Sequence, residues 1–361
     1  MPRAREIGIR IGVLPTGPTN SVLDVAGVGL GHTTLVRDES PPPDGRGTAR
    51  TGVTTLLLAE DAYTRPLAAG GAVLNGAGEC TGFLTAREWA TIETPVYLTS
   101  TMQLGRVYDA ACLIALEQHP DVAGDVVIPV VGECDDSFLN DCRAMQVETA
   151  DVRASYQEAV SSRGAEAPPA EGSIGAGTGM SCLGYKGGIG TASRVTPEGH
   201  TVAVLLLTNF GERKRLTVTG VPVGALVPTE DFGPARPAGS CIGVVVTDAT
   251  VGGSDCARLA RRIGLGLART GSTGHHGSGE IFLAASTTCR TDRDGRPEQG
   301  ARVAGRGLDD LFEAVVDAAE ESVLNSLLGS STTVGRDGNT VEGLDPATLE
   351  RLLQEAGRAG H

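Results

Sequence analysis

Apolar residues recur at helical spacing in four segments of the chain. We predict helices over residues 104–118, 255–269, 308–328 and 346–356. In 308–328 the apolar positions form one stripe, the arrangement by which a helix covers a core. Asp309 and Asp310 begin this segment, and negative charge stabilises the N-terminal end of a helix.

Short runs of β-branched residues, each bounded by glycine or proline, lie between these segments. They predict strands over residues 52–58, 94–98, 125–131, 201–207, 241–246 and 281–285. Prolines, glycines and charges predict loops at 40–51 and 228–239, and 161–173 is typical of a flexible connector. Strands interleaved with helices indicate layered packing, either α/β or α+β.

Composition and charge exclude several classes of protein. With 40% apolar and 20% charged residues the chain is globular, and its net charge of −14 argues against nucleic acid as a partner. No apolar stretch is long enough to span a membrane, and the first residues lack the apolar core of a signal peptide. Eight scattered cysteines without a CxxC pair fit a reducing compartment. We therefore expect a cytoplasmic location.

The standard cofactor and metal motifs are absent from the sequence. It contains no GxxxxGK[ST] phosphate loop, and its glycine runs at 27–31 and 175–179 lack the third spaced glycine of a dinucleotide turn. It also lacks HExxH and paired Cys/His spacings, so we expect no metal and no organic cofactor.

The segment 275–280, HHGSGE, is one candidate for chemistry. It is similar to a GxSxG nucleophile elbow, with His276 in place of the first glycine. One interpretation is a conventional hydrolase that uses Ser278 with His275 or His276 as its base. The other is a glycine-rich turn that enters the strand at 281–285.

Gly239-Ser240 is a second candidate, at the junction of a Pro/Gly loop and a strand. Taken alone, it is an ordinary turn. A serine hydroxyl held against the preceding carbonyl can nevertheless attack it, and Gly239 has no side chain in the way. Hydrolysis of the resulting ester frees the α-amine of Ser240, whose reference pKa of about 7.7–8.0 suits it to act as the base for its own hydroxyl.

A series of short motifs resembles the self-processing β-peptidyl aminopeptidases and L-aminopeptidase/D-amidases, the DmpA-like family, over almost the whole chain. In order along the chain they are 10–18 (RIGVLPTGP), 24–28 (DVAGV), 31–32 (GH), 75–79 (NGAGE), 93–96 (ETPV), 132–133 (GE), 139–141 (LND), 175–179 (GAGTG), 186–190 (KGGIG), 208–211 (TNFG), 239–240 (GS), 267–271 (LARTG) and 278–280 (SGE). Each motif is weak alone, but their common order makes the resemblance specific.

The resemblance implies an αββα sandwich like that of N-terminal-nucleophile hydrolases and ornithine acetyltransferases. It implies one domain, 1–361, cut into chains 1–239 and 240–361 that stay together. It further implies a homo-oligomer, a tetramer by resemblance, and a serine aminopeptidase or amidase that removes N-terminal residues from short peptides, amides or esters.

The resemblance also assigns roles to individual residues. Ser240 is the expected nucleophile, formed by cleavage of the Gly239–Ser240 bond. Ser278 and Glu280 resemble the pair that orients the nucleophile and handles its protons. Asn209 resembles the oxyanion-hole donor. Glu133 resembles the carboxylate that binds the free amino group of the substrate.

One position departs from the family pattern. Two residues after Glu133 the family usually has an aromatic residue, and a tyrosine there can assist the oxyanion, whereas this chain has Asp135. A carboxylate cannot donate a hydrogen bond and repels an oxyanion unless it is protonated or turned away. Asp135 therefore leaves open a non-catalytic member of the same fold, and the fold itself also leaves open an acyl transferase to an amino acceptor.

Overall fold

The fold is that of a computed structural model, which describes residues 1–227, 239–298 and 300–357. Its strands are β1 Gly29–Asp38, β2 Thr48–Leu57, β3 Leu67–Gly76, β4 Thr91–Ile92, β5 Val96–Ser100, β6 Val130–Cys134, β7 Ser181–Cys182, β8 Tyr185–Lys186, β9 Ile189–Val195, β10 Thr201–Asn209, β11 Ser240–Thr247, β12 Gly279–Arg290, β13 Thr333–Val334 and β14 Thr340–Val341. Its α-helices are α1 Phe83–Glu88, α2 Leu104–Gln118, α3 Thr149–Ser161, α4 Val223–Leu226, α5 Gly253–Thr270, α6 Gly307–Leu328 and α7 Pro346–Glu355. Within the described ranges, none of these helices is both long and apolar enough to cross a membrane.

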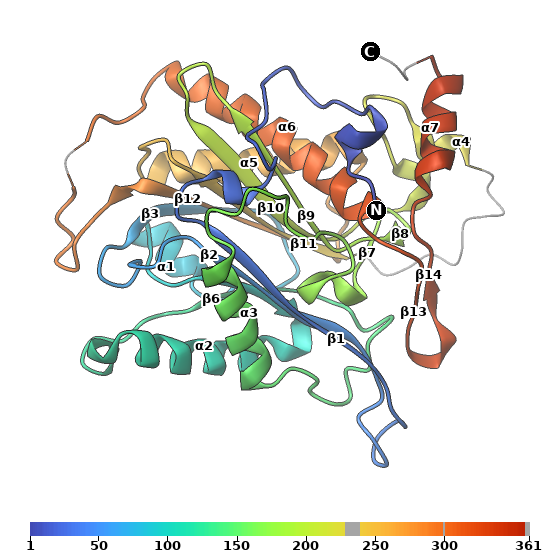
Figure 1. Ribbon diagram of the computed structural model, residues 1–361, viewed down its shortest axis with the longest axis horizontal. Helices are drawn as coiled ribbons and strands as arrows, with labels where there is room; N and C mark the ends of the chain where they lie inside the picture. The colour runs from blue at the N-terminus through green and yellow to red at the C-terminus, as the bar shows by residue number, and fades with distance from the viewer. Residues whose placement is uncertain (228–238, 299, 358–361) are drawn as a thin grey trace.

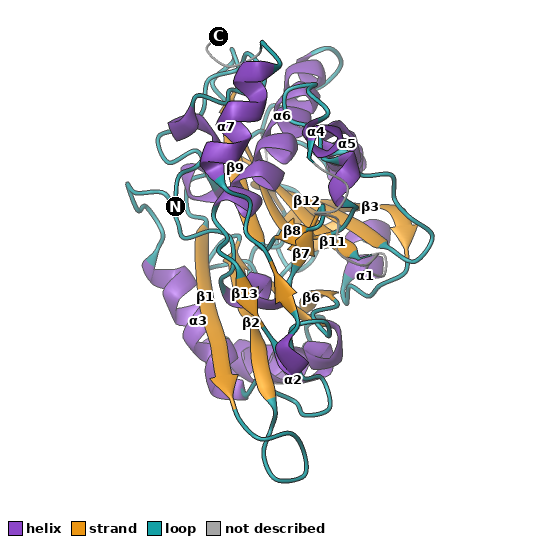
Figure 2. Ribbon diagram, turned by 90° about the vertical axis from the view of Figure 1, so that its right-hand side faces the viewer, coloured by secondary structure: helices purple, strands orange, loops and turns teal. Residues whose placement is uncertain are grey.

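Two sheets lie face to face between two layers of helices (Figure 1 and Figure 2). One sheet has the strand order β1-β2-β5-β6 and is covered by α2 and α3. The other has the order β4-β3-β12-β11-β10-β9 and is covered by α5 and α6. Leu56 and Leu98 of the first sheet share a buried core with Leu205 and Val244 of the second. This arrangement confirms the expected αββα sandwich.

Small residues let the covering helices approach the six-stranded sheet closely. A side chain on Gly70 of β3 would place its Cβ 2.4 Å from the amide nitrogen of Ala257 in α5. A side chain on Gly190 of β9 would place its Cβ 1.9 Å from the carbonyl oxygen of Ser322 in α6. Glycine at these strand positions is therefore required by helix packing.

The four predicted helices are confirmed as α2, α5, α6 and α7. The strand predicted over 125–131 is wrong in its first five residues, because β6 begins only at Val130. Val126 and Ile128 are exposed, Val127 packs only in a small cluster with Tyr63 and Val122, and Pro129 cannot donate to a ladder. The loop predicted over 40–51 is wrong at its end, where residues from Thr48 onward pair with β1.

The centre of the six-stranded sheet is a parallel pair, β11 and β12, connected by α5. On either side of this pair lie β10 and β3, each antiparallel to its neighbour. Ser240 is the first residue of β11. The junction predicted for cleavage thus lies at the end of a central strand, and residues 228–238 of the loop predicted before it lie outside the described residues.

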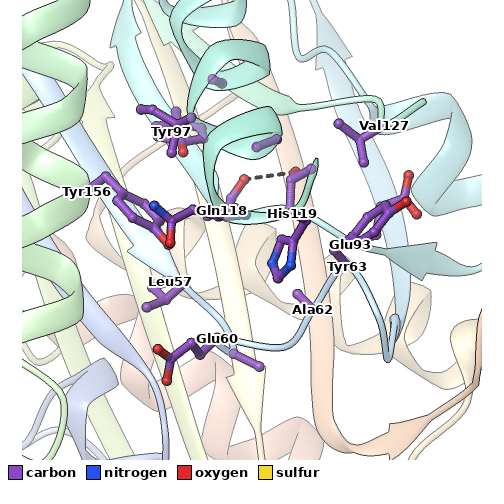
Figure 3. A pocket seen from close by; sticks show the side chains of 16 residues that line it. Leu57, Glu60, Ala62, Tyr63, Glu93, Tyr97, Gln118, His119, Val127 and Tyr156 are labelled. Atoms are coloured by element: carbon purple, nitrogen blue, oxygen red, sulfur yellow. Dashed lines mark hydrogen bonds between the residues drawn. The ribbon is translucent and has the colours of Figure 1, made fainter. Parts of the chain in front are cut away.

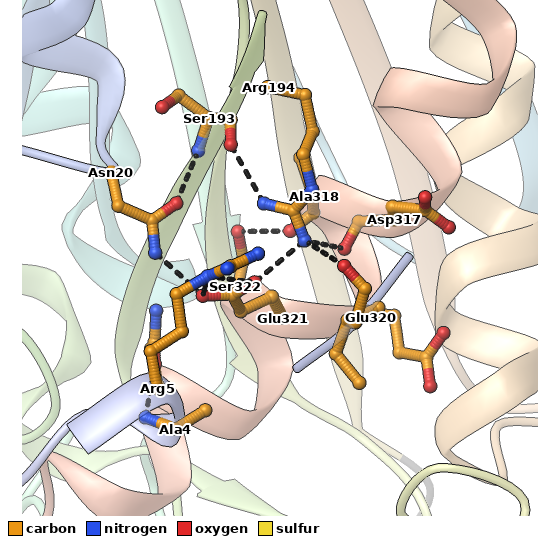
Figure 4. Close-up of polar contacts among 12 residues, drawn as sticks. Ala4, Arg5, Asn20, Ser193, Arg194, Asp317, Ala318, Glu320, Glu321 and Ser322 are labelled. Carbon is orange, nitrogen blue, oxygen red and sulfur yellow. Dashed lines mark hydrogen bonds and ion pairs between the residues drawn. The ribbon is translucent and has the colours of Figure 1, made fainter. Parts of the chain in front are cut away.

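A buried ion network joins the N-terminal segment to α6 (Figure 4). Arg194 of β9 donates to the carboxylate of Glu321 at 2.6 Å, and both side chains are fully buried. Arg5 and Asn20 donate to the same carboxylate at 3.0 and 2.6 Å. Glu321 therefore connects three segments that are distant in the sequence.

Loss of the Glu321 charge should destabilise the fold strongly. In Glu321→Gln the shape of the side chain is kept, but Arg194 is left buried without its counter-charge, so we expect the free energy of unfolding to fall by about 3–5 kcal/mol. Urea denaturation measures this change.

Glu355→Gln is the matched control, because it removes the same charge from an exposed pair with Arg351. We expect that change to cost less than about 1 kcal/mol. Equal losses in the two variants would contradict the role given to Glu321.

Candidate active site

Ser240 lies at the point where three strands of the central sheet meet. It is opposite Asn209, the last residue of β10, in the antiparallel ladder, and the next residue, Cys241, is opposite Glu280 of β12. The side chain is 7% exposed, and the backbone N–H of Gly279 donates to its Oγ at 3.3 Å. A donor at this position stabilises negative charge that develops on Oγ.

Gly239 precedes Ser240 in a position that admits no side chain. A Cβ on this residue would lie 1.5 Å from the carbonyl oxygen of Asn209 and 3.2 Å from its Nδ2. The ladder between β10 and β11 therefore requires glycine here, and it places the side-chain amide of Asn209 beside the Gly239–Ser240 peptide.

The side chains of Ser278 and Glu280 are bonded to each other beside Ser240. The Ser278 hydroxyl donates to Glu280 Oε2 at 2.9 Å and has the carbonyl oxygen of His275 as a second acceptor at 2.8 Å. Burial raises the pKa of Glu280, although the hydrogen bond from Ser278 opposes this shift. A hydroxyl has one proton, so both bonds are fully formed only when Glu280 is protonated and donates to Ser278.

His275 and His276 contribute backbone groups to this arrangement. Nδ2 of Asn75 lies within hydrogen-bonding distance of the carbonyl oxygens of His275, His276 and Ser278, at 2.9, 3.2 and 2.5 Å. Neither imidazole forms a hydrogen bond to another described residue, and His276 is exposed. The geometry therefore favours the interpretation of 275–280 as a turn over a pair of Ser278 with a histidine base.

Glu133 lies near the end of β6, is 3% exposed, and is close to the segment that contains Gly279. Its carboxylate accepts from the backbone N–H of Glu79 at 2.7 Å and from the Thr101 hydroxyl. Gly78 lies between Glu133 and Gly279, since a Cβ on it would be 3.2 Å from Glu133 Oε1 and 3.6 Å from Gly279 Cα. Burial, with the charges of Asp135 and Glu79 in support, raises the pKa of Glu133.

Asp135 contacts the site through its backbone. Its carbonyl oxygen accepts from Asn209 Nδ2 at 2.8 Å, while its exposed carboxylate accepts from the backbone N–H of Ser137 at 2.8 Å. The carboxylate is thus bonded within its own turn, and the backbone rather than the side chain of Asp135 contacts the candidate oxyanion donor.

Sequence reasoning missed three contributions to this site. Asn75 holds the 275–278 turn, Thr101 binds Glu133, and the Gly279 N–H faces Ser240. Asn75 lies in the family-like motif 75–79, so that motif is its one sequence signal. Gly279 lies in the family-like motif 278–280, although nothing in that motif indicated its N–H contact, and Thr101 lies in none of the motifs.

A separate pocket lies between the four-stranded sheet and helices α2 and α3 (Figure 3). Tyr63, Tyr97, Tyr156 and His119 line it together with Glu60 and Glu93, among other residues. The two carboxylates already bind Arg163 and Arg293 at 2.6 and 2.7 Å. None of the residues around Ser240 lines this pocket.

In the described part of the chain, no group of three or more His, Cys, Asp or Glu side chains is arranged to hold a metal ion.

Comparison with known proteins gives one consistent result. Residues 20–341 match Peptidase family S58. The β-peptidyl aminopeptidase BapA of Sphingosinicella microcystinivorans is 35% identical, with 98% of this chain and 92% of that protein covered.

Two solved structures superpose over nearly their whole length. A β-aminopeptidase of a Burkholderia species has a TM-score of 0.88 at 38% identity, with 99% of each chain covered. The L-aminopeptidase D-Ala-esterase/amidase of Ochrobactrum anthropi has a TM-score of 0.90 at 33% identity, with 100% of each chain covered. The latter is a prototype of the serine aminopeptidases and a variant of the Ntn-hydrolase fold.

Substitution of Gly239 by alanine should disturb the start of β11. Because the new Cβ would overlap the Asn209 carbonyl, the two strands must separate locally, and we expect a loss of about 1–3 kcal/mol. Thermal unfolding in a Ser240→Ala background measures the effect with the peptide bond intact in both proteins.

Gly105→Ala is the control, since no atom lies within 4 Å of the Cβ it adds to helix α2. We expect that change to be neutral or to stabilise by about 0.5–1 kcal/mol. An unchanged melting temperature in Gly239→Ala would contradict the close approach.

Proposed function

The chain belongs to peptidase family S58, and on that premise we propose a precursor that cuts its own Gly239–Ser240 bond and then uses Ser240 as its nucleophile. The protein is a serine aminopeptidase, a hydrolase that acts on peptides. The observation that carries the proposal is the ladder register, in which Asn209 is opposite Ser240 and Glu280 is opposite the next residue.

The self-cleavage step uses only the precursor and water. Ser240 Oγ attacks the carbonyl carbon of Gly239, its proton passes to the amide nitrogen of Ser240, and the carbon–nitrogen bond breaks to leave an ester. Water then hydrolyses the ester, which gives a carboxylate on Gly239 and restores the hydroxyl of Ser240. The Gly279 N–H supports the step because it faces the attacking oxygen.

Cleavage converts the amide nitrogen of Ser240 into a free amine. An α-amine has a reference pKa of about 7.7–8.0, so a large share of it is an unprotonated base near neutral pH. It takes the Oγ proton as the substrate carbonyl is attacked and returns it to the leaving group. Ser278 and Glu280 support this cycle as a hydrogen-bonded pair beside the new amine.

Asn209 and Glu133 complete the proposed machinery. One N–H of Asn209 Nδ2 is bonded to Asp135, and the other is the proposed donor to the oxyanion. Glu133 forms no ion pair among the described residues, so the ammonium group of a substrate is a suitable counter-charge. A binding site for the amino group next to the nucleophile limits cleavage to the first residue of a short peptide or amide.

The proposed fragments 1–239 and 240–361 remain one body after cleavage. The smaller fragment supplies β11 and β12, which lie between β10 and β3 of the larger one. Arg5 and Arg194 of the larger fragment bind Glu321 of the smaller one. We propose this two-chain unit as the subunit of a homo-oligomer, a tetramer by resemblance to the family.

Mass spectrometry of the purified protein tests self-cleavage. We expect two fragments, the second beginning at Ser240, and one intact chain for Ser240→Ala because the attacking oxygen is absent. The variant that replaces both His275 and His276 by alanine should still cut itself and turn over an amino-acid p-nitroanilide. Active, uncut wild-type protein, or activity retained in Ser240→Ala, would rule out the proposal.

Acid should weaken substrate binding through Glu133. Its pKa is raised, so its charge is lost on acidification at a higher pH than that of an ordinary glutamate, and KM should rise as the pH falls through this range. Glu133→Gln should raise KM by about 10–100-fold at neutral pH, the cost of a lost charged pair of about 1.4–2.8 kcal/mol. It should also remove the acid dependence of KM. Steady-state kinetics from pH 5 to 8 measure both, and an unaltered KM profile in the variant would exclude Glu133 from binding the amine.

A further inference from the structure

The carboxamide of Asn209 is fixed at both ends by backbone groups. Its Nδ2 donates to the carbonyl oxygen of Asp135 at 2.8 Å, and its Oδ1 accepts from the N–H of Ser181 at 2.9 Å. A flipped amide loses both bonds, so the two backbone groups determine where the second N–H of Nδ2 points. They belong to segments that are far apart in the sequence.

Asp136 anchors the first of these segments from inside the protein. Its side chain is 1% exposed, and Oδ1 accepts from Ser100 Oγ at 2.8 Å and from Asn140 Nδ2 at 3.1 Å. Its Oδ2 is buried and makes no well-aligned hydrogen bond among the described residues, although the nearby Thr51 hydroxyl lowers the pKa of this carboxyl. Burial raises the pKa of Asp136 to about 6. The residue that follows the Asp135 carbonyl is therefore a buried carboxylate with one oxygen that lacks a well-aligned hydrogen bond in the described ranges.

Lys186 anchors the second segment. Strands β7 and β8 form a hairpin in which Lys186 is directly opposite Ser181, and the turn residues Leu183 and Gly184 both have positive φ. Lys186 is fully buried, and Nζ donates to the carbonyl oxygens of Gly177 and Gly187 at 2.9 and 2.8 Å. Burial lowers the pKa of Lys186 to about 7, and the negative charge of Asp136 opposes this shift.

The two buried charges lie on either side of one tight turn, residues Gly175–Gly179. Lys186 binds the carbonyl of Gly177 in this turn, and a Cβ on Gly179 would lie 2.7 Å from the Cβ of Asp136. Neither side chain has an ion-pair partner within 4.0 Å in the described ranges. The two charges are therefore not in direct contact, and the charge of Asp136 acts on Lys186 across the turn.

We infer that Lys186 and Asp136 are positioning residues, a buried pair of opposite charges that holds the Ser181 N–H and the Asp135 carbonyl and so aims the Asn209 amide. This inference rests on the proposed function, because it gives Asn209 the role of oxyanion donor. Neither residue touches the substrate. They act through the two backbone groups that bind the carboxamide.

Removal of one charge leaves the other buried and uncompensated, which favours movement of its segment toward water. The Asn209 amide then loses one of its two anchors. Removal of both charges eliminates this imbalance, so the two substitutions should be strongly non-additive. A misaimed oxyanion donor slows the chemical step and leaves binding of the substrate amine unchanged, because Glu133 is held by other groups.

The test compares Lys186→Met, Asp136→Asn and the double variant in full-length protein, with kcat expressed per cleaved chain. We expect each single substitution to lower kcat about 10–100-fold with KM within about twofold, a smaller loss than removal of an oxyanion donor itself. The kcat of the double variant should be at least severalfold higher than that of either single variant. Self-cleavage should also be slower in each single variant than in the double variant.

Arg194→Met is the matched control, because it also removes a fully buried cation, but from the network with Glu321. We expect it to lower the melting temperature without a change in kcat measured well below that temperature. Asp136→Asn keeps the size of the side chain and its Oδ1 acceptor. This variant alone therefore tests the inference if Lys186→Met does not fold.

The outcomes separate this inference from the proposed function. If the wild type and Arg194→Met cut themselves and turn over substrate while Asp136→Asn keeps its kcat, the positioning inference is wrong and the proposed function stands. The positioning inference is also overturned if the two substitutions lower kcat additively in the double variant, or if they raise KM and leave kcat unchanged. An uncut and inactive wild type overturns the proposed function itself.

Discussion

The parallel pairing of β11 and β12 in the middle of the six-stranded sheet is the constraint on which the rest of the structure depends. It makes Ser240 a strand residue with neighbours on both sides, so the sheet register itself brings Asn209 and Glu280 to the start of β11. The adjacent antiparallel ladder between β10 and β11 requires Gly239, because it brings the Asn209 carbonyl to within 1.5 Å of where a Cβ would be. It also explains how a chain cut at this bond can remain whole, since the strands after the cut are enclosed by strands before it.

Charge gives the site a second property. Glu133 and Glu280 are both buried, both have raised pKa values because of burial, and neither forms an ion pair with another described residue. The uncut chain is therefore short of positive charge beside Ser240. In the proposed function, self-cleavage supplies one amine at Ser240, and each substrate brings another to Glu133. Until such charges arrive, two buried carboxylates without counter-charges are costly to keep ionised.

Much of the fold could be predicted from the sequence, but for different reasons in different elements. Helices α2, α5, α6 and α7 follow from helical spacing of apolar residues. Strands β3 and β9 escaped prediction because they contain Gly70 and Gly190 where helices pack closely, and glycine is not a strand signal. Residues 125–129 carry a strand-like pattern, but β6 begins only at Val130 and Val127 packs in a small separate cluster with Tyr63 and Val122, so the prediction there was wrong. For the site, the resemblance carried by the ordered motifs predicted roles for Ser240, Ser278, Glu280, Asn209 and Glu133. The bonds made by Asn75, Thr101 and the Gly279 N–H arise only when distant strand ends meet.

The central claim is that Ser240, rather than Ser278, carries the acyl group during turnover. The most direct test is to quench the enzyme during reaction with a slowly hydrolysed amino-acyl ester and to locate the added mass by peptide mapping. The account predicts one acyl group on the peptide that begins at Ser240, and none in Ser240→Ala. An acyl group on the peptide that contains Ser278, or turnover with no acylated serine, would contradict it.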